Sequence, residues 1–223
     1  MKKTKFLVLV LVVSIMLVGA GYAYWDQTLT IKNTVETGYL DVSFIDYDDD
    51  DWDDFPELCN SDLVTTNAII SPDGQSLDFT VTNFYPGAGA SLAFVVENTG
   101  TVAAKIETVT GTILNNTALA NALNYKFDQV VRKPIIGPLT YEAIDAVDAD
   151  NVDDLAAGLT NALKNIVIQP GEKLMLRTSN ILLPNGTEAP NYQILMPDTI
   201  SGSQFEDTTT SFRLSLKFIQ VNY

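Results

Sequence analysis

The chain contains no histidine and only one cysteine, Cys59. Without histidine it lacks the commonest general base, the commonest metal ligand, and every triad or His-Glu-x-x-His zinc helix that depends on an imidazole. One cysteine cannot form a disulfide within the chain or complete a zinc site by itself, so we expect it to be a buried structural residue. Histidine-based catalysis is therefore excluded, and we expect the protein not to be an enzyme.

Basic side chains are also scarce: 13 lysines and arginines stand against 28 aspartates and glutamates, which gives a net charge of −15. Lys2, Lys3 and Lys5 fall in the first 23 residues, which contain no acid, so the rest of the chain carries 10 basic and 28 acidic side chains. Such an acidic surface repels phosphate backbones and anionic lipid headgroups. We therefore expect no nucleic-acid partner and no electrostatic docking on membranes.

The N-terminus has the layout of a secretory signal peptide. The lysines form a positive n-region, residues 6–20 form an apolar stretch broken only by Ser14 and Gly19, and Gly21 and Ala23 supply small residues at a cleavage site. This stretch is shorter than the roughly 20 residues that a membrane span needs. The pattern predicts a signal peptide over residues 1–23 that signal peptidase cleaves between Ala23 and Tyr24. It predicts a secreted protein that meets the membrane only during export, with an uncleaved anchor as the alternative.

Alternating apolar and polar residues dominate the rest of the chain. The clearest runs lie at residues 40–44, 77–81, 92–96 and 212–218, and turns rich in proline, glycine and asparagine separate them. Such alternation is typical of strands with one buried face. Asp150 and Asn151 precede an amphipathic stretch that predicts a helix ending near Lys164, and residues 118–123 predict a shorter helical turn. The sequence thus predicts one mostly β domain over residues 24–223, an antiparallel β-sandwich with a small helical insertion.

Several short motifs follow one another in an order that resembles a known family. Tyr24 and Trp25 come directly after the signal peptide, residues 36–42 read Glu-Thr-Gly-Tyr-Leu-Asp-Val, and Tyr85-Pro86-Gly87 leads to a strand ending in Asn98-Thr99-Gly100-Thr101. This order, together with residues 103–106 and the terminal strand 212–221, resembles the TasA/camelysin family of secreted fibre proteins, including related bundling pilins of archaea. The acidic segment between residues 44 and 77 departs from the family pattern, and so does the absence of a polar tail.

The resemblance implies a jelly-roll β-sandwich whose mature N-terminal segment, residues 24–35, inserts as a donor strand into the next subunit. Its self-assembly residues would be Tyr24, Trp25, Leu29, Ile31 and Val35. The residues themselves are compatible with this role, because a segment with alternating apolar side chains can add to an open sheet edge. The same segment could equally form the first strand of its own sheet.

The densest feature of the chain is an acidic run between residues 46 and 57. Clustered carboxylates suit calcium, which takes several oxygen ligands, although the spacing is not that of an EF-hand. The candidate calcium ligands are Asp48, Asp49, Asp50, Asp51, Asp53 and Asp54. A solvated loop that keeps the protein soluble is the other interpretation, and no cofactor is required by either.

Two sequons, at Asn115 and Asn185, could accept glycans in an exported protein. Taken together, these features predict an extracellular filament or biofilm-matrix subunit whose main partner is itself. One alternative is a monomeric surface adhesin or glycan-binding sandwich. A second is a secreted hydrolase that uses a pair of carboxylates, although no such pair stands out.

Overall fold

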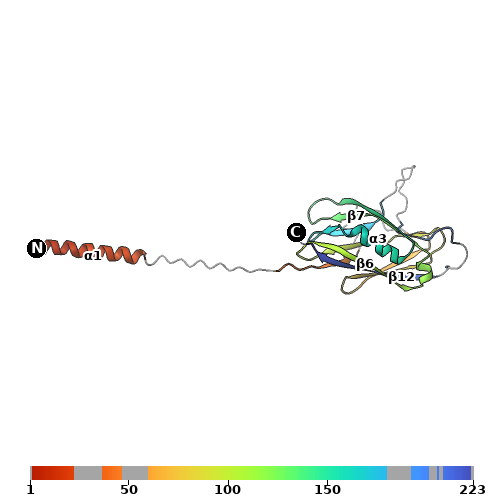
Figure 1. Ribbon diagram of the computed structural model, residues 1–223, viewed down its shortest axis with the longest axis horizontal. Helices are drawn as coiled ribbons and strands as arrows, with labels where there is room; N and C mark the ends of the chain where they lie inside the picture. Colours follow the sequence, from red (N-terminus) through yellow and green to blue (C-terminus); the bar gives the residue numbers. More distant parts are fainter. Residues whose placement is uncertain are drawn as a thin grey trace. The chain divides into compact units, whose positions relative to one another are not determined.

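The computed structural model describes residues 2–22, 37–46, 60–179, 192–200, 205 and 208–221. Two compact units divide the chain, residues 1–37 and Gly38–Tyr223. In the first, helix α1 (Lys2–Tyr22) covers most of the predicted signal peptide (Figure 1). Among the described residues, no helix combines the length and apolar character that crossing a membrane requires. The predicted cleavage site at Ala23 and Tyr24 lies outside the described residues.

The second unit is a sandwich of two antiparallel sheets (Figure 1), which confirms the predicted fold class. The first sheet has the order β1-β5-β10-β7-β11-β4, and β8 also pairs with β7. Its strands are β1 (Val42–Ile45), β4 (Gly89–Ala90), β5 (Phe94–Asn98), β7 (Asn124–Lys133), β8 (Thr140–Ala149), β10 (Lys173–Arg177) and β11 (Ile194–Leu195). The second sheet has the order β2-β3-β12-β6-β9. Its strands are β2 (Thr65–Ile70), β3 (Ser76–Thr82), β6 (Ala104–Asn115), β9 (Val167–Ile168) and β12 (Thr209–Gln220).

The core lies between the sheets and is built by the alternating residues that the sequence predicts. The side chains that β3 and β12 turn inward are all buried: Leu77, Phe79, Val81, Phe212, Leu214 and Leu216. The rings of Phe79 and Phe212 are 5.7 Å apart, and Tyr125 of β7 meets Phe212 edge-on at 5.5 Å across the sandwich. Each fully buried large apolar side chain stabilises the fold by about 1.5–3 kcal/mol.

The central strands of the first sheet are buried on both faces. Phe94 and Val96 face the core as predicted, but Val95 between them is also buried, and it joins Val131 and Met175 in a second apolar cluster. These three residues are cross-strand neighbours on β5, β10 and β7. Continuous apolar runs are typical of strands that are covered on both sides.

Helix α3 (Val152–Leu163) confirms the helix predicted near residues 150–164. The side chain of Asn151 caps it by accepting a hydrogen bond from the Asp154 amide at 2.8 Å. Leu155, Leu159 and Leu163 form its buried face. The short helix α2 (Thr117–Ala120) overlaps the turn predicted at residues 118–123.

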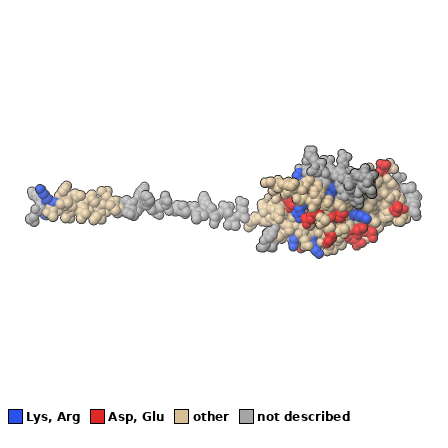
Figure 2. Space-filling model, turned by 90° about the horizontal axis from the view of Figure 1, so that it is seen from above, with Lys and Arg blue, Asp and Glu red and all other residues tan. Residues whose placement is uncertain are grey.

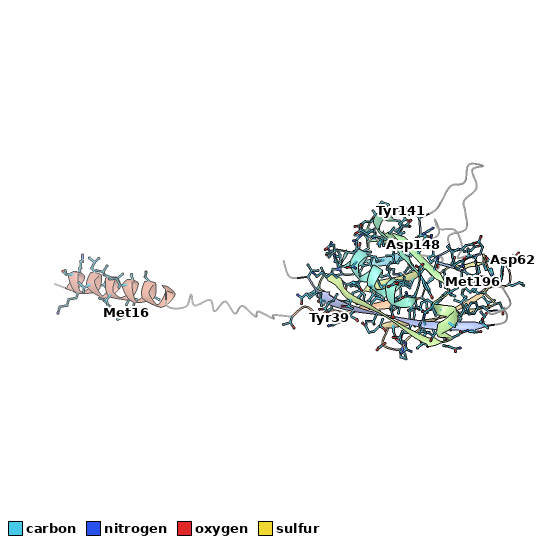
Figure 3. The ribbon with its side chains drawn as sticks, turned by 45° about the vertical axis from the view of Figure 1, so that its right-hand side comes forward. Met16, Tyr39, Asp62, Tyr141, Asp148 and Met196 are labelled. Atoms are coloured by element: carbon cyan, nitrogen blue, oxygen red, sulfur yellow. The ribbon has the colours of Figure 1, made fainter. Side chains whose placement is uncertain are left out.

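Strand β12 runs the length of the sandwich and defines its two ends. At one end Gln220 pairs with Ala104, and at the other Ser211 pairs with Asn115. We call the first the exit end, because the backbone of Tyr39 pairs there with Thr101. The other is the far end. Figure 3 shows Tyr39 at the exit end and Asp62 at the far end. Twelve residues of strand span about 40 Å, at roughly 3.3 Å per residue.

Candidate functional site

Most of the predicted site residues lie outside the described part of the chain. This holds for the donor segment (Tyr24, Trp25, Leu29, Ile31, Val35), for the calcium candidates at residues 48–54, for Cys59 and for Asn185. Asn115 is described: it is exposed at the end of β6, and its backbone carbonyl accepts a hydrogen bond from Thr210 Oγ1 at 2.9 Å. Its side chain therefore lies where a glycan could be attached.

Five hydrogen bonds hold the segment through which the N-terminal part of the chain joins the sandwich, one of them from the Tyr39 hydroxyl to Thr99 O at 3.3 Å. Gly100 N donates to Asp41 O at 3.0 Å and Thr101 N donates to Tyr39 O at 3.0 Å. Tyr39 N donates to Thr101 Oγ1 at 2.9 Å, and Thr99 Oγ1 donates to Asp41 Oδ2 at 2.7 Å. We call residues 39–41 and 99–101 the exit clamp. The clamp extends the β1–β5 pairing and fixes where residues before Gly38 leave the sandwich.

The local sequence explains why the clamp can close so tightly. A Cβ atom at Gly100 would lie 2.7 Å from both Asp41 N and Tyr39 O, so only glycine fits there. Asn98 is fully buried and shapes the turn: its Nδ2 donates to Val102 O and Ile168 O at 2.9 Å, and its Oδ1 accepts from Gly100 N at 3.0 Å. Two motifs that the sequence analysis singled out separately, at residues 36–42 and 98–101, thus meet here.

The edge of β1 is closed by the turn between β2 and β3. Phe44 N donates to Gly74 O at 2.7 Å, and Gln75 Nε2 donates to Val42 O at 2.8 Å. Gly74 adopts a positive φ of 68°, which glycine tolerates without strain. Two of the backbone groups that β1 turns away from β5, Val42 O and Phe44 N, therefore already have partners.

Two other edges are closed by different devices. Helix α3 lies along β6, where Thr160 Oγ1 accepts from Val109 N at 2.9 Å in place of a neighbouring strand. On β4, Gly89 O accepts from Ser61 N and Gly89 N donates to Ser61 Oγ, both at 2.8 Å. Covering an edge in this way prevents another chain from pairing with it.

Strand β2 differs from these edges. Ser71 and Ser76 form a hydrogen-bonded pair just beyond the β2–β3 ladder, since Ser71 N donates to Ser76 O. Bonded and non-bonded pairs alternate along an antiparallel ladder, so residues 65, 67 and 69 of β2 are the ones bonded to β3. The N–H and C=O groups of Thr66, Ala68 and Ile70 therefore point away from the sheet. No described residue donates or accepts a backbone hydrogen bond at this outer edge.

The composition of β2 also lacks the usual protection of an edge. Its sequence, Thr-Thr-Asn-Ala-Ile-Ile, has no charge, no proline and no glycine, and such six-residue segments pair readily with other strands. Ile69 is 58% exposed. Ala68 is exposed as well, although it lies opposite the buried Phe79 and therefore on the core side of the sheet. Strand β8 is also an edge, because it pairs only with β7, but it carries Glu142, Asp145 and Asp148. Charged side chains protect an edge, so β2 is better suited to accept a further strand.

Several charged side chains of the described sandwich form ion pairs. Arg213 on β12 binds Asp78 on β3 through two hydrogen bonds, at 2.5 and 2.7 Å, and these bonds lower the pKa of Asp78 and raise the pKa of Arg213. Burial alone would lower the pKa of Arg132, but its hydrogen bonds to Glu142 and Glu172 raise it. Burial raises the pKa of the Tyr125 hydroxyl. A hydrogen bond from Ser71 also lowers the pKa of Asp73. Asp78 and Asp73 therefore both lack the raised pKa that a carboxylic acid needs to act as a general acid.

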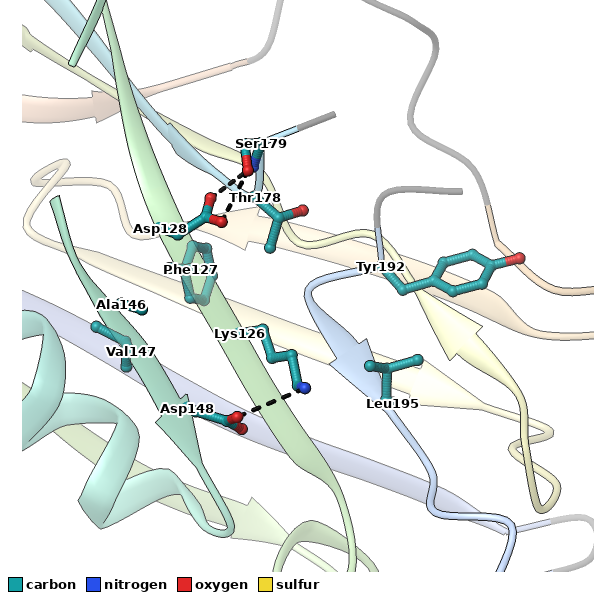
Figure 4. A pocket seen from close by; sticks show the side chains of 10 residues that line it. All are labelled: Lys126, Phe127, Asp128, Ala146, Val147, Asp148, Thr178, Ser179, Tyr192 and Leu195. Carbon is teal, nitrogen blue, oxygen red and sulfur yellow. Dashed lines mark hydrogen bonds and ion pairs between the residues drawn. The ribbon is translucent and has the colours of Figure 1, made fainter. Parts of the chain in front are cut away.

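A pocket of about 280 Å³ opens where the β7–β8 ladder is interrupted (Figure 4). Phe127 pairs with Val147, but the next pair is Gln129 with Ala143, so three residues of β8 oppose Asp128 alone. The charged groups of the pocket are already engaged. Lys126 Nζ lies 3.5 Å from Asp148 Oδ2, and the Asp128 carboxylate accepts from the backbone N and the hydroxyl of Ser179. We assign no ligand to this pocket.

Within the described residues, no group of three or more histidine, cysteine, aspartate or glutamate side chains is placed to hold a metal ion. The acidic run lies outside them, so the calcium prediction remains a prediction. Comparison with family models, curated proteins and solved structures found no significant match to this chain. The resemblance to secreted fibre proteins therefore also remains a prediction.

Proposed function

We propose that this protein is the structural subunit of an extracellular filament. Growth occurs when the N-terminal segment of one copy, residues 24–35, adds as a strand to the edge of β2 in the next copy. The observation that carries the proposal is the β2 edge, which carries no charge and has no backbone partner among the described residues. Other parts of the chain cover β1, β4 and β6 at least in part, and the remaining edge strand, β8, carries Glu142, Asp145 and Asp148.

The positions of the two elements favour head-to-tail growth. Residues before Gly38 leave from the exit end, whereas β2 begins at the far end, since Thr65 pairs with Thr82 and Thr82 with Thr209. The segment from Tyr24 to Thr37 is 14 residues long and can reach up to about 50 Å at 3.3–3.6 Å per residue, longer than the sandwich strands. Contact between different surfaces of identical subunits builds an open fibre when the rotation between successive copies does not close a ring.

Strand direction agrees with this arrangement. β2 runs from the far end towards the middle of its sandwich. The donor segment of the neighbouring copy would run in the opposite direction, because its C-terminal residues join their own sandwich beside this far end. The added strand would therefore be antiparallel to β2. It would satisfy the outward backbone groups of Thr66, Ala68 and Ile70, as β-strand addition does in peptide recognition.

The chemistry of the surfaces supports an uncharged contact. Acidic side chains spread over the visible face of the sandwich with basic ones among them (Figure 2), and the chain carries a net charge of −15, which makes copies repel each other. Association then depends on main-chain hydrogen bonds and on apolar residues such as Leu29 and Ile31. Each would contribute about 1.5–3 kcal/mol if buried.

Cleavage before Tyr24 would set the donor segment free, because α1 would otherwise remain attached to it. The intact mass of secreted protein tests this step. A mass that begins at Tyr24 supports it, and a mass that includes residues 1–20 contradicts it.

Electron microscopy and sedimentation of residues 24–223 test the function itself. We expect fibres from this protein and soluble monomers from residues 36–223, which retain the sandwich. Ala68→Pro is a matched test of the acceptor edge: proline removes an N–H that points outward, so the β2–β3 ladder keeps its bonds while strand addition is blocked. Fibres that form normally without residues 24–35 would exclude the donor-strand mechanism. A protein that never polymerises would favour the monomeric adhesin.

A further inference from the structure

The turn between β7 and β8 presents two isoleucines to solvent. Ile135 is 73% exposed and Ile136 is 89% exposed, and Pro134 and Pro138 flank them. Burying an aliphatic side chain is favourable, and two large ones side by side at a turn are unusual on an acidic surface. We call residues 134–138 the hairpin tip. Its exposure needs an explanation that the sandwich core does not give.

The hairpin tip is held firmly. Arg132 Nε binds Glu142 Oε2 across the two strands at 2.9 Å, and Arg132 NH1 binds Glu172 Oε1 at 3.1 Å and Val167 O at 2.7 Å. Ile135 also rests over Gly171, where any Cβ atom would collide with it. The two prolines further restrict the backbone. The anchored strands and the two prolines therefore limit the positions that Ile136 can take, which lowers the entropy cost of binding.

The hairpin tip lies at the exit end. Gly171, beneath Ile135, donates a hydrogen bond to Asn98 O at 2.6 Å, and Asn98 is bonded in turn to Gly100 of the exit clamp. Tyr39, in the clamp itself, is 56% exposed at the same end. Apolar side chains thus surround the point at which the N-terminal segment leaves the sandwich.

The far end presents an exposed leucine immediately before β2. Leu63 is 79% exposed and has a positive φ of 70°, a conformation that costs a non-glycine residue energy. Its backbone is fixed by Asn83 Nδ2, which donates to Leu63 O at 3.3 Å, and by the adjoining turn, in which Val64 N donates to Ser61 O. A strained backbone that exposes an apolar side chain is a feature of binding surfaces.

We infer that the hairpin tip is a second docking element, whose partner is the far end of another copy of this chain around Leu63. The inference rests on the proposed function. When the acceptor copy holds the N-terminal segment of the donor copy along its β2 edge, the far end of the acceptor lies next to the exit end of the donor. Ile135 and Ile136 of the donor project at this exit end. The donor strand then provides the link between subunits, and the hairpin tip sets the angle at which they stack.

Measurement of the critical concentration for fibre growth tests this inference in residues 24–223. Ile136→Ser should raise that concentration about 10- to 100-fold, the loss that corresponds to one buried aliphatic side chain, while Ile136→Leu should leave it nearly unchanged. The melting temperature of the monomer should be the same for all three proteins, because the side chain is exposed. Leu63→Ser should have a similar effect, and the double variant should be little worse than either single one.

An unchanged critical concentration for Ile136→Ser, in a wild-type protein that forms fibres, would overturn the inference and leave the proposed function standing. Additive effects of Ile136→Ser and Leu63→Ser would show that the two side chains do not meet, and would overturn the pairing. If Ile136→Ser instead abolished binding to phosphatidylcholine vesicles without altering growth, the tip would be a membrane contact and the inference would be wrong. A wild-type protein that forms no fibres would overturn both.

Discussion

Replacing Gly100 by alanine should open the exit clamp. The new Cβ would lie 2.7 Å from Asp41 N and from Tyr39 O, and both are backbone atoms that cannot rotate away. Residues 39–41 would therefore have to move, and the five hydrogen bonds of the clamp would be lost. Because the clamp residues other than Gly100 are exposed, each bond is worth about 0.5 kcal/mol, the lower end of the usual range, and the loss totals about 2.5 kcal/mol.

Thermal unfolding followed by circular dichroism measures this loss. For a domain of this size about 2.5 kcal/mol corresponds to a fall of roughly 5–10 °C in melting temperature. Thr101→Val is the matched control: it removes only the bond from Tyr39 N to Thr101 Oγ1 and should lower the melting temperature by about 1–2 °C. A Gly100→Ala protein that melts with the wild type would refute the reasoning, since it would show that the clamp contributes nothing to the fold.

Three further predictions follow from other parts of the molecule. Thr160→Val should destabilise the sandwich by about 1–2 kcal/mol in urea unfolding, because the Val109 amide loses its acceptor, whereas Thr160→Ser should retain most of the stability. The hydrogen bonds from Arg213 lower the pKa of Asp78 in the folded protein below its ordinary value of 3.8. The stability that this pair contributes is therefore complete above pH 3.8, and it is lost as the pH falls through the lower pKa of the folded protein. Asp78→Asn should make unfolding less sensitive to acid, and an acid-unfolding curve identical to that of the wild type would contradict this prediction. Calcium bound by residues 46–57 should raise the melting temperature by mass action, and an unchanged melting curve between millimolar calcium and a chelator would indicate a solvated loop.

The sequence was most informative where one strand face is buried without interruption. Apolar and polar residues alternate cleanly over residues 77–81 and 212–218. Strands β3 and β12 bury the apolar residues of these runs, apart from Phe218, which is half-buried. The helix at 152–163 was also predictable, because Asn151 is a good N-cap and the leucines recur on one face. Local patterns therefore gave the fold class.

Strands β6, β7 and β8 carry weaker alternation signals, and the alternation did not predict them. In β7 the register shift at Asp128 moves the alternation from Tyr125 and Phe127 to the adjacent Val130 and Val131. Strand β8 is mostly exposed, so it has no buried stripe to reveal it. In β6 threonines interrupt the apolar residues, and two irregularities break its register with β12. Bulges and exposure remove the period of two on which strand prediction depends.

The candidate assembly surfaces needed the structure because they depend on long-range contacts. The motifs at residues 36–42 and 98–101 are about 60 residues apart, and nothing local indicates that they form one clamp. That β2 has no backbone partner on its outer edge among the described residues can be seen only in the folded chain. The exposure of Ile136 and Leu63 likewise depends on how the rest of the sandwich packs. The donor segment itself was proposed from its alternation and from a resemblance, and it lies outside the described residues.

The most direct test of the filament mechanism mixes two variants that each retain one half of the contact. Ala68→Pro in residues 24–223 keeps the donor segment but has a blocked β2 edge, whereas residues 36–223 keep the edge but have no donor. Each alone should remain monomeric in analytical ultracentrifugation, and together they should form a 1:1 heterodimer that grows no further. Failure to form a heterodimer from two folded monomers, or fibre growth by either variant alone, would contradict head-to-tail donation to β2.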